Sequence, residues 1–189
     1  RNDCPVITYT GVLSVTRIPT PLLPALRELR EENIRFRLKF IGNTCPELRQ
    51  LVEENGLTAD TEYISYLPHD ESIRHINSSD ALLLVIDNVP NNKGILTGKL
   101  FEYIGAQRSI LAVGNTEGEA RHIIDECQCG EMVDYNDTEG AKRILRKLHE
   151  AWQRQTPAYS FSNSSRYSRE ATTGELAHFM NHVLSRHSK

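Results

Sequence analysis

The residues whose types and spacing could do chemistry stand at the start of a predicted helix. Thr97 is a good N-cap residue, and apolar residues recur at helical spacing after it, which places Lys99 in the first helical turn. A cation there opposes the helix dipole, unless an anion meets both the ammonium and the free amides of the helix end. Gly98 would let a phosphate come close to the backbone. Glu102, on the same helix, could accept hydrogen bonds from ribose hydroxyls.

A surface ion pair is the alternative explanation for the same residues. Lys99 and Glu102 stand at i and i+3, and an exposed Lys–Glu pair at this spacing is worth roughly 0.2–0.5 kcal/mol. The spacing alone does not separate a phosphate site from such an ion pair.

The loop at residues 11–17 is a second candidate for phosphate binding. It begins with Gly11 but lacks the G-x-G-x-x-G pattern of dinucleotide-binding proteins, which disfavours a nicotinamide enzyme. Arg17 could reach the same phosphates as Lys99, because a guanidinium can bind an oxyanion in bidentate fashion. A solvated arginine beside a helix start is the alternative for this residue.

Alternating strands and helices must position these residues. An apolar run at residues 81–86 fits a strand buried on both faces, and a polar loop at 87–93 separates it from the helix that carries Lys99. Strand and helix patterns alternate along the whole chain. The strands are expected at residues 6–10, 36–41, 63–66, 81–86, 109–113 and 131–135.

Cap residues mark several of the expected helix starts. Thr44 with Glu47, and Thr116 with Glu119, have the spacing of a capping box. Asp137 is a good N-cap for a long amphipathic helix. The helices are expected to begin near residues 22, 44, 68, 97, 116, 137 and 169.

The expected architecture is α/β: a doubly wound, Rossmann-like parallel sheet of six strands in the order 3-2-1-4-5-6, with a C-terminal helix in addition. Ligands of such sheets bind beyond the carboxyl ends of the strands, at the switch point between the first and fourth strands. The two loops at that point are residues 11–17 and 87–99. Because Arg17 and Lys99 lie on these loops, the topology favours a phosphate site over a surface ion pair.

The composition is that of one α/β domain with a sizeable core. The chain has 189 residues and a net charge of −3, so a nucleic-acid partner is not indicated. Residues 142–189 hold nine Lys and Arg against three Glu. This basic segment could approach an anionic membrane or an acidic partner, although a solvated helix face is the simpler explanation for each charge. No run approaches the ~20 apolar residues of a membrane span.

The cysteines and histidines show no metal-site pattern. The four cysteines lack zinc spacing and are expected to be reduced thiols in a cytosolic protein. His178 and His182 stand at i and i+4, but no acidic third ligand shares their helical face, so no metal is expected. No catalytic base stands out either. The chain begins without a Met or a signal peptide, and we expect a segment of a longer polypeptide whose chemistry depends on a missing part.

Several segments, taken in order, resemble a known enzyme family. They are residues 9–17, 38–42, 63–71, 79–84 and 98–104, and the last, with the sequence GKLFEYI, is the most specific. Together they are similar to the C-terminal, donor-binding domain of GT-B glycosyltransferases, close to family 4. The resemblance covers nearly the whole chain.

The resemblance implies a role for each candidate residue. Arg17 corresponds to the basic residue that grips the donor diphosphate. Glu102 corresponds to the second Glu of the family's Glu–seven residues–Glu motif, which holds the ribose hydroxyls. The backbone near Leu67 would contact the nucleobase, and the helix start at Thr97 and Gly98 would face the diphosphate.

Two positions depart from the family pattern. The first Glu of the motif falls on Gly94, so its contact with the sugar hydroxyls is absent or supplied otherwise. The basic residue that normally follows the loop glycine, Gly11, falls on Val12, and Lys99 is expected to replace its charge.

The resemblance implies the donor-binding half of a glycosyltransferase that moves a sugar from a nucleoside-diphosphate sugar to an acceptor, with retention, in bacterial cell-surface glycan or polysaccharide synthesis. Residues 1–156 would form the nucleotide-sugar-binding domain, and 157–189 a linker and a helix that packs toward a missing N-terminal domain. That domain would hold the acceptor and the orienting histidine, so the chain carries no catalytic residue and would be inactive alone. No metal or other cofactor is expected. The protein would be cytoplasmic, with its basic segment able to reach the inner face of the membrane.

Two other functions remain open for this fold. A nucleotide-sugar epimerase would bind the same ligand but release an altered sugar without an acceptor. A non-catalytic binding domain of the receiver type would need an acidic cluster at the end of the first strand, which residues 9–11 do not supply.

Overall fold

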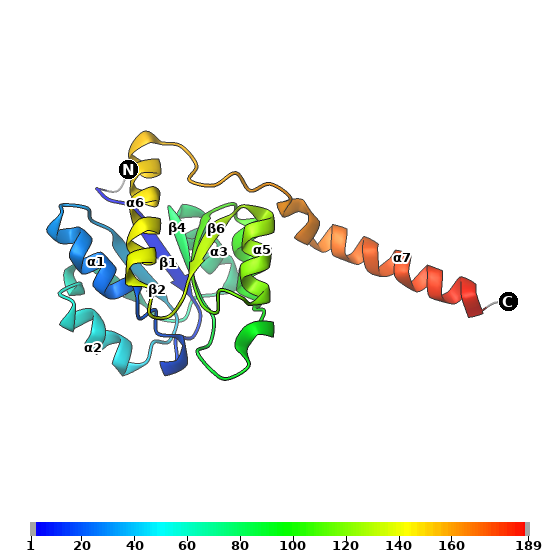
Figure 1. Ribbon diagram of the computed structural model, residues 1–189, viewed down its shortest axis with the longest axis horizontal. Helices are drawn as coiled ribbons and strands as arrows, with labels where there is room; N and C mark the ends of the chain where they lie inside the picture. Colours follow the sequence, from blue (N-terminus) through cyan, green and yellow to red (C-terminus); the bar gives the residue numbers. More distant parts are fainter. Residues whose placement is uncertain (1–2, 188–189) are drawn as a thin grey trace.

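Within residues 3–187, which the computed structural model describes, six parallel strands form a sheet that helices cover on both faces (Figure 1). The strands lie in the order β3-β2-β1-β4-β5-β6. The predicted doubly wound α/β fold and its strand order are therefore confirmed. The bounds are β1 Val6–Thr10, β2 Arg37–Ile41, β3 Thr61–Ile64, β4 Ala81–Val85, β5 Ser109–Val113 and β6 Gly130–Val133.

Two sets of helices cover the two faces of the sheet. On one face lie α1 Leu22–Glu31, α2 Pro46–Glu54 and α6 Thr138–Arg154; on the other lie α3 His69–Ser78, α4 Gly98–Gly105 and α5 Glu119–Cys127. A last helix follows them, α7 Arg169–His187. Short 3-10 turns are found at η1 Val15–Arg17, η2 Thr58–Asp60, η3 Asn92–Gly94 and η4 Ser164–Tyr167.

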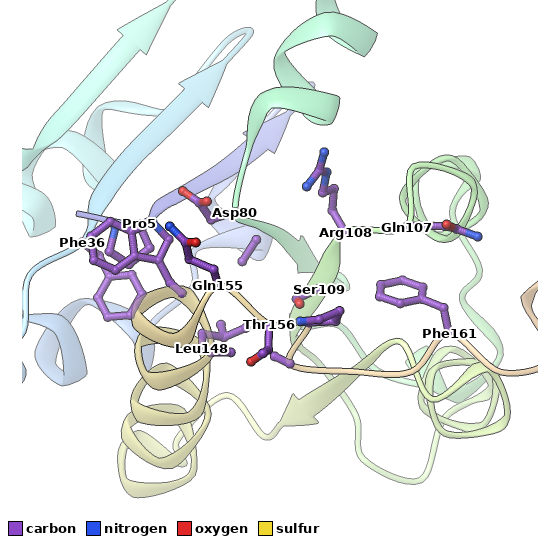
Figure 2. A pocket seen from close by; sticks show the side chains of 15 residues that line it. Pro5, Phe36, Asp80, Gln107, Arg108, Ser109, Leu148, Gln155, Thr156 and Phe161 are labelled. Carbon is purple, nitrogen blue, oxygen red and sulfur yellow. The ribbon is translucent and has the colours of Figure 1, made fainter. Parts of the chain in front are cut away.

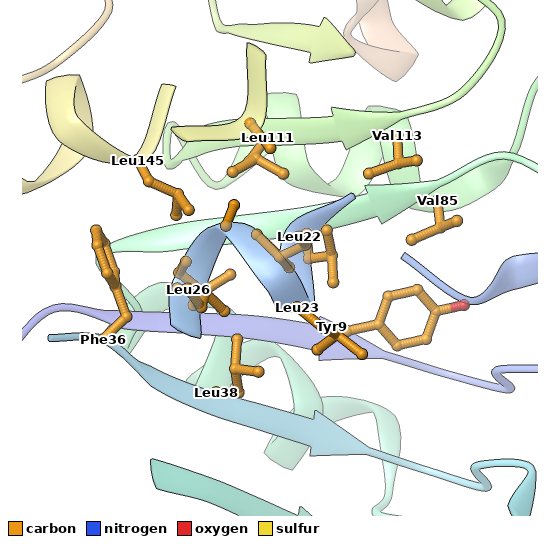
Figure 3. Packing of buried hydrophobic residues seen from close by; sticks show 14 of the residues in the cluster. Tyr9, Leu22, Leu23, Leu26, Phe36, Leu38, Val85, Leu111, Val113 and Leu145 are labelled. Carbon is orange, nitrogen blue, oxygen red and sulfur yellow. The ribbon is translucent and has the colours of Figure 1, made fainter. Parts of the chain in front are cut away.

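The central strands alternate their side chains between two hydrophobic clusters. In β4, Leu83 and Val85 belong to the cluster beneath α1, α2 and α6, whereas Leu82 and Leu84 belong to the cluster on the opposite face. Figure 3 shows the first cluster, with helix α1 packed on this side of the sheet. A strand covered on both faces is apolar at successive positions, which is why this strand could be identified from sequence.

Both predicted capping boxes are wrong. Helix α2 begins at Pro46 with Cys45 at the N-cap, so Thr44 stands one residue too early. Proline at the first helical position fixes the start, because its φ angle suits the helix and it has no amide to satisfy. Helix α5 has Gly118 at its N-cap instead of Thr116, and no side chain caps it.

The predicted start of α6 is confirmed, whereas two predicted strand ends are wrong by two residues. Asp137 is the N-cap of α6, and its Oδ1 accepts a hydrogen bond from the Gly140 amide at 2.8 Å. Strand β3 ends at Ile64, so Tyr66 lies in the following loop with 81% of its surface exposed. Strand β6 ends at Val133, two residues earlier than predicted.

The segment at residues 157–167 runs back over the domain before α7 begins (Figure 1). The Tyr159 hydroxyl donates a hydrogen bond to Glu131 Oε1 at 3.0 Å. The Tyr167 hydroxyl donates to Glu126 Oε2 at 2.7 Å. Side chains of this segment therefore hold it to the domain at more than one point.

Helix α7 extends away from the domain (Figure 1). Among the described residues, it contacts mainly the adjoining turn η4. Leu176, Phe179 and Met180 of this helix are 57%, 62% and 55% exposed. The helix thus presents apolar side chains that its own domain leaves largely uncovered.

Acidic residues of the domain balance much of the positive charge of α6. Three ion pairs of 2.6–2.9 Å join this helix to other elements: Lys142 with Glu28, Arg146 with Glu32, and Lys147 with Glu131. Within residues 3–187, no helix has both the length and the apolar character needed to cross a membrane.

Candidate functional site

Lys99 lies across the end of strand β1. Its Nζ donates a hydrogen bond to the Tyr9 hydroxyl at 2.8 Å and stands 4.5 Å from the centroid of that ring. The side chain also passes close to Gly11, where an added Cβ would lie 2.7 Å from Lys99 Cε. Gly11 has a φ of +107°, so both its conformation and the space beside it favour glycine. The first loop and the helix start therefore meet, as the topology predicted.

The Lys99 ammonium makes no ion pair with any carboxylate in the described part of the chain. The surface Lys99–Glu102 pair considered above is therefore not formed. Burial, followed by the positive charge of Arg17, lowers the pKa of Lys99 to about 8, although Asp87 and Glu102 oppose the shift. A partly buried ammonium beside a guanidinium favours an anion as its neighbour.

Arg17 is held by the carboxylate that follows strand β4. Its Nε donates to Asp87 Oδ2 at 2.8 Å, and its Nη2 lies 2.7 Å from the same oxygen. The Thr16 hydroxyl donates to the other oxygen, Oδ1, at 2.7 Å. Arg17 is therefore an ordered side chain and not a freely solvated one.

Two polar groups link Arg17 to Lys99. The Tyr9 hydroxyl, which accepts from Lys99, donates to the Val12 carbonyl at 2.9 Å. The same carbonyl accepts a longer bond of 3.5 Å from Arg17 Nη1. The structure thus brings Arg17, Lys99 and Gly11 together at the carboxyl ends of β1 and β4.

The start of α4 is open to an approaching ligand. Thr97 occupies the N-cap position as predicted, but its hydroxyl caps no amide and is buried without a hydrogen-bond partner. Gly98 is exposed, and an added Cβ there would meet no atom within 4 Å. Glu102 is exposed one turn further on. Free helix amides beside Lys99 are suited to binding an anion.

Gly94 and Leu67 lie on the loops that follow β4 and β3, at the same edge of the sheet but with β1 and β2 between them. Gly94 ends the turn η3, is exposed and has open space around it. Leu67 follows β3 and is partly buried. Among the described residues, no hydrogen bond or ion pair joins either of them to Lys99 or Arg17.

Sequence reasoning missed the residues that fix the loop after β4. The Tyr135 hydroxyl donates to the carbonyl of Ile86 or Asp87, at 3.0 and 3.1 Å, and accepts from Asn92 Nδ2 at 3.0 Å. Asn92 Nδ2 also donates to the Asp87 carbonyl at 2.9 Å, and its Oδ1 accepts from Asn115 at 3.0 Å. Their positions in the sequence could have indicated them, since these residues follow the carboxyl ends of strands β4, β5 and β6.

A separate hollow of about 500 Å³ lies at the opposite, amino edge of the sheet (Figure 2). Asp80 and Arg108, which precede β4 and β5, line it together with Leu148 and Phe161. The Asp80 carboxylate accepts a hydrogen bond from the Val6 amide at 2.8 Å, which ties down the start of β1. This hollow contains none of the candidate residues identified from sequence.

Metal-binding residues do not gather anywhere in the described chain. Across residues 3–187, no group of three or more His, Cys, Asp or Glu side chains is arranged to hold a metal ion. His178 and His182 lie on α7, at a distance from the carboxyl edge of the sheet (Figure 1).

Solved structures similar in fold to this chain include glycosyltransferases of the GT-B class. Sucrose-phosphate synthase from Thermosynechococcus elongatus matches 97% of this chain with a TM-score of 0.71 and 14% identity. HepE from Anabaena, in complex with UDP, matches 95% with a TM-score of 0.73 and 15% identity. The pneumococcal O-GlcNAc transferase GtfA, in complex with UDP and GlcNAc, matches 96% with a TM-score of 0.65 and 12% identity.

These similarities concern the fold, since the identities are low. The chain spans 46%, 49% and 35% of the lengths of these three proteins, which is half or less of each. No protein-family model matches the sequence, and neither does any curated protein sequence. The predicted resemblance to a GT-B domain is thus confirmed at the level of the fold.

Proposed function

We propose that this chain is the donor-binding half of a GT-B glycosyltransferase, and that it binds a nucleoside-diphosphate sugar across the carboxyl edge of its sheet. The observation that carries the proposal is Lys99: a partly buried ammonium that pairs with no carboxylate of residues 3–187, beside Arg17 and the free amides of α4. The fold supports it, because the structures of HepE and GtfA with this fold contain UDP.

The charges at this edge suit the chemistry of sugar transfer. When the bond between sugar and diphosphate breaks, negative charge develops on the departing diphosphate. Arg17, Lys99 and the amides at Gly98 would stabilise that charge, and they supply a positive field without a metal ion. Glu102 would hold the ribose hydroxyls, and the backbone near Leu67 would contact the base.

The sugar itself would be held differently from the usual pattern. Gly94 offers no carboxylate where the family has its first Glu, and the space around it is open. The proposed donor site therefore recognises the diphosphate and the ribose more strongly than the sugar hydroxyls.

The rest of the reaction would require a second domain. The matched glycosyltransferases are about twice as long as this chain or longer, and α7 presents Leu176, Phe179 and Met180 to its surroundings. We infer that α7 packs against an N-terminal domain that binds the acceptor and carries the orienting histidine. Transfer would proceed with retention, in the synthesis of a cell-surface glycan or polysaccharide on the cytoplasmic side of a membrane. The 189-residue chain alone would bind donor without transferring sugar.

Isothermal titration calorimetry with UDP, GDP and ADP tests the donor site. We expect one of them to bind, and Lys99→Ala and Glu102→Ala to weaken that binding about tenfold each, the effect of losing one charged contact. Lys93→Ala is the matched control, because Lys93 lies on the same loop but is paired with Glu117 at the surface. Equal affinity in the wild type and in both site variants would reject the assignment.

A further inference from the structure

Both oxygens of the Asp87 carboxylate contact residues of the loop after β1. Oδ2 accepts from Arg17 Nε at 2.8 Å and lies 2.7 Å from Arg17 Nη2, while Oδ1 accepts from the Thr16 hydroxyl at 2.7 Å. Arg17 and Asp87 are 70 residues apart in the sequence. The contact therefore joins the two loops that meet at the switch point of the sheet.

The position of this acid calls for an explanation. A carboxylate beside a diphosphate site repels the ligand, and Asp87 stays ionised there. Burial acts to raise its pKa, but the hydrogen bonds from Arg17 and Thr16 outweigh burial and hold the pKa of Asp87 below its ordinary value. If Asp87 belongs to the site, its unfavourable charge must be offset by another contribution to ligand binding.

We propose that Asp87 is a positioning residue for phosphate recognition, an inference that rests on the proposed function. Asp87 holds Arg17 by its Nε and Nη2, which leaves Nη1 on the side of the Val12 carbonyl and Lys99. The guanidinium then presents its remaining donors toward the same anion that Lys99 faces. An arginine without this anchor would sample many rotamers and lose conformational entropy on binding.

Asp87 is itself held in place, as an anchor must be. Its carbonyl accepts from Asn92 Nδ2 at 2.9 Å and lies 3.1 Å from the Tyr135 hydroxyl. Its exposed fraction is 19% against 32% for Arg17, so the acid lies deeper than the cation that it holds. The order from interior to surface is thus a fixed backbone, a partly buried carboxylate and a more exposed guanidinium that would reach the ligand.

The alternative gives a result of opposite sign. If Asp87 only adds unfavourable charge, then Asp87→Asn removes a negative group and should strengthen anion binding. If Asp87 positions Arg17, then the same substitution should weaken binding although it makes the site more positive. The direction of the change therefore separates the two explanations.

A double-mutant cycle measured with UDP by calorimetry tests the proposal. We expect Asp87→Asn to weaken UDP binding about tenfold, the cost of misplacing one charged contact. In an Arg17→Gln background, Asp87→Asn should have no further effect, because the residue acts through Arg17. Asp87→Glu, which keeps a carboxylate, should restore part of the affinity.

Asp125→Asn is the matched control. It also removes a carboxylate from an arginine, since Arg121 Nε donates to Asp125 Oδ2 at 2.6 Å, but it lies near the end of α5 that faces the amino edge. We expect its UDP affinity to equal that of the wild type. If Asp87→Asn does not fold, Thr16→Val gives a milder form of the same test, with about threefold weaker binding expected from the loss of one neutral donor.

Two outcomes would overturn the inference while leaving the proposed function intact. They are tighter UDP binding by Asp87→Asn, and additive effects of Asp87→Asn and Arg17→Gln in the cycle. Failure of the wild-type chain to bind UDP, GDP or ADP would instead reject the proposed function and this inference with it.

Discussion

The Lys99 ammonium should lower the stability of the ligand-free chain and raise its affinity for an anionic ligand. Its ammonium is partly buried, its hydrogen-bond partner is the Tyr9 hydroxyl, and its pKa falls to about 8 because of burial and the charge of Arg17. Moving an ammonium out of water without a carboxylate partner is unfavourable. A diphosphate would offset that cost in the complex alone, so such a side chain is typical of a binding site.

Lys99→Met should stabilise the ligand-free chain and reduce its response to nucleotide. Methionine keeps the packing on the Tyr9 ring and carries no charge, so we expect the free energy of unfolding at pH 7 to rise by about 1 kcal/mol, a discounted figure for a partly solvated group. Urea unfolding with and without UDP measures both effects. UDP should raise the Tm of the wild type more than that of the variant at the same UDP concentration.

The difference in free energy of unfolding between the wild type and Lys99→Met should depend on pH with a definite sign. The pKa of Lys99 in the folded chain is about 8, below its ordinary value of 10.5. Below pH 8 both folded and unfolded chains carry the proton, so the full cost of the buried charge is present. Above pH 8 the folded chain loses its proton first, and the wild type gains stability relative to the variant. A difference that does not shrink above pH 8, or a variant less stable than the wild type at pH 7, would contradict the assignment.

At this scale the sequence predicted the cations but not the groups that orient them. Lys99 was identified because it opposes a helix dipole, and Arg17 because it stands on the loop after the first strand. Tyr9 falls within the apolar run of β1, and nothing in the run shows that its hydroxyl lies at the edge of the sheet. Asp87 is one polar residue of a polar loop, and its pairing with Arg17 follows only from the fold.

Among the elements, the loop between β4 and α4 is fixed by a residue that belongs to neither. Tyr135 follows β6. Its buried hydroxyl contacts the backbone carbonyls of Ile86 and Asp87 and the side-chain Nδ2 of Asn92. Burial raises the pKa of Tyr135 to about 12, so the hydroxyl stays a donor at physiological pH. These contacts span more than 40 residues of sequence, so local patterns could not predict them.

Tyr135→Phe should loosen this loop and weaken UDP binding. Removing the hydroxyl leaves buried polar groups with fewer partners, at a cost of about 1–2 kcal/mol in the free energy of unfolding. Hydrogen exchange of the amides at residues 88–97 should become faster, and UDP affinity should fall, because the anchor at Asp87 is less rigid. Both effects can be followed by exchange mass spectrometry and calorimetry.

Tyr159→Phe provides the control for this loop. It removes a hydroxyl that donates to Glu131 at 3.0 Å, outside the carboxyl edge of the sheet. We expect unchanged exchange at residues 88–97 and unchanged UDP affinity. If Tyr135→Phe behaves in the same way, the loop is held by other contacts and the preorganisation argument is wrong.

For the whole molecule, the order of the strands followed from simple rules. Strands that alternate with helices form a parallel sheet with right-handed crossovers, and the Rossmann-type strand order predicted for it places β1 beside β4, as observed. The path of residues 157–167 could not be predicted, because that segment has no periodicity. Its aromatic side chains pack on both hydrophobic clusters, Tyr159 on one and Phe161 and Tyr167 on the other.

Two truncations separate the contribution of this segment from that of α7. Deleting residues 169–189 removes a helix whose apolar side chains are largely exposed, so we expect the Tm to change by less than about 2 °C. Deleting residues 157–189 also removes Tyr159 and Tyr167, and uncovers apolar surface on both faces of the sheet. The expected loss is roughly 2–3 kcal/mol, or about 5–10 °C in Tm.

Differential scanning calorimetry of the two truncated chains decides whether the domain ends near residue 168. If only the longer deletion lowers the Tm, the segment at 157–167 is part of the folded unit. Helix α7 is then free to contribute its apolar side chains to another surface, as the proposed two-domain enzyme requires. Equal destabilisation by both deletions would mean that α7 stabilises its own domain, and that a second domain is not needed to account for it. Unchanged UDP affinity in the shorter deletion would add that the donor site is complete without α7, since Lys99, Arg17 and Asp87 all lie at the far carboxyl edge.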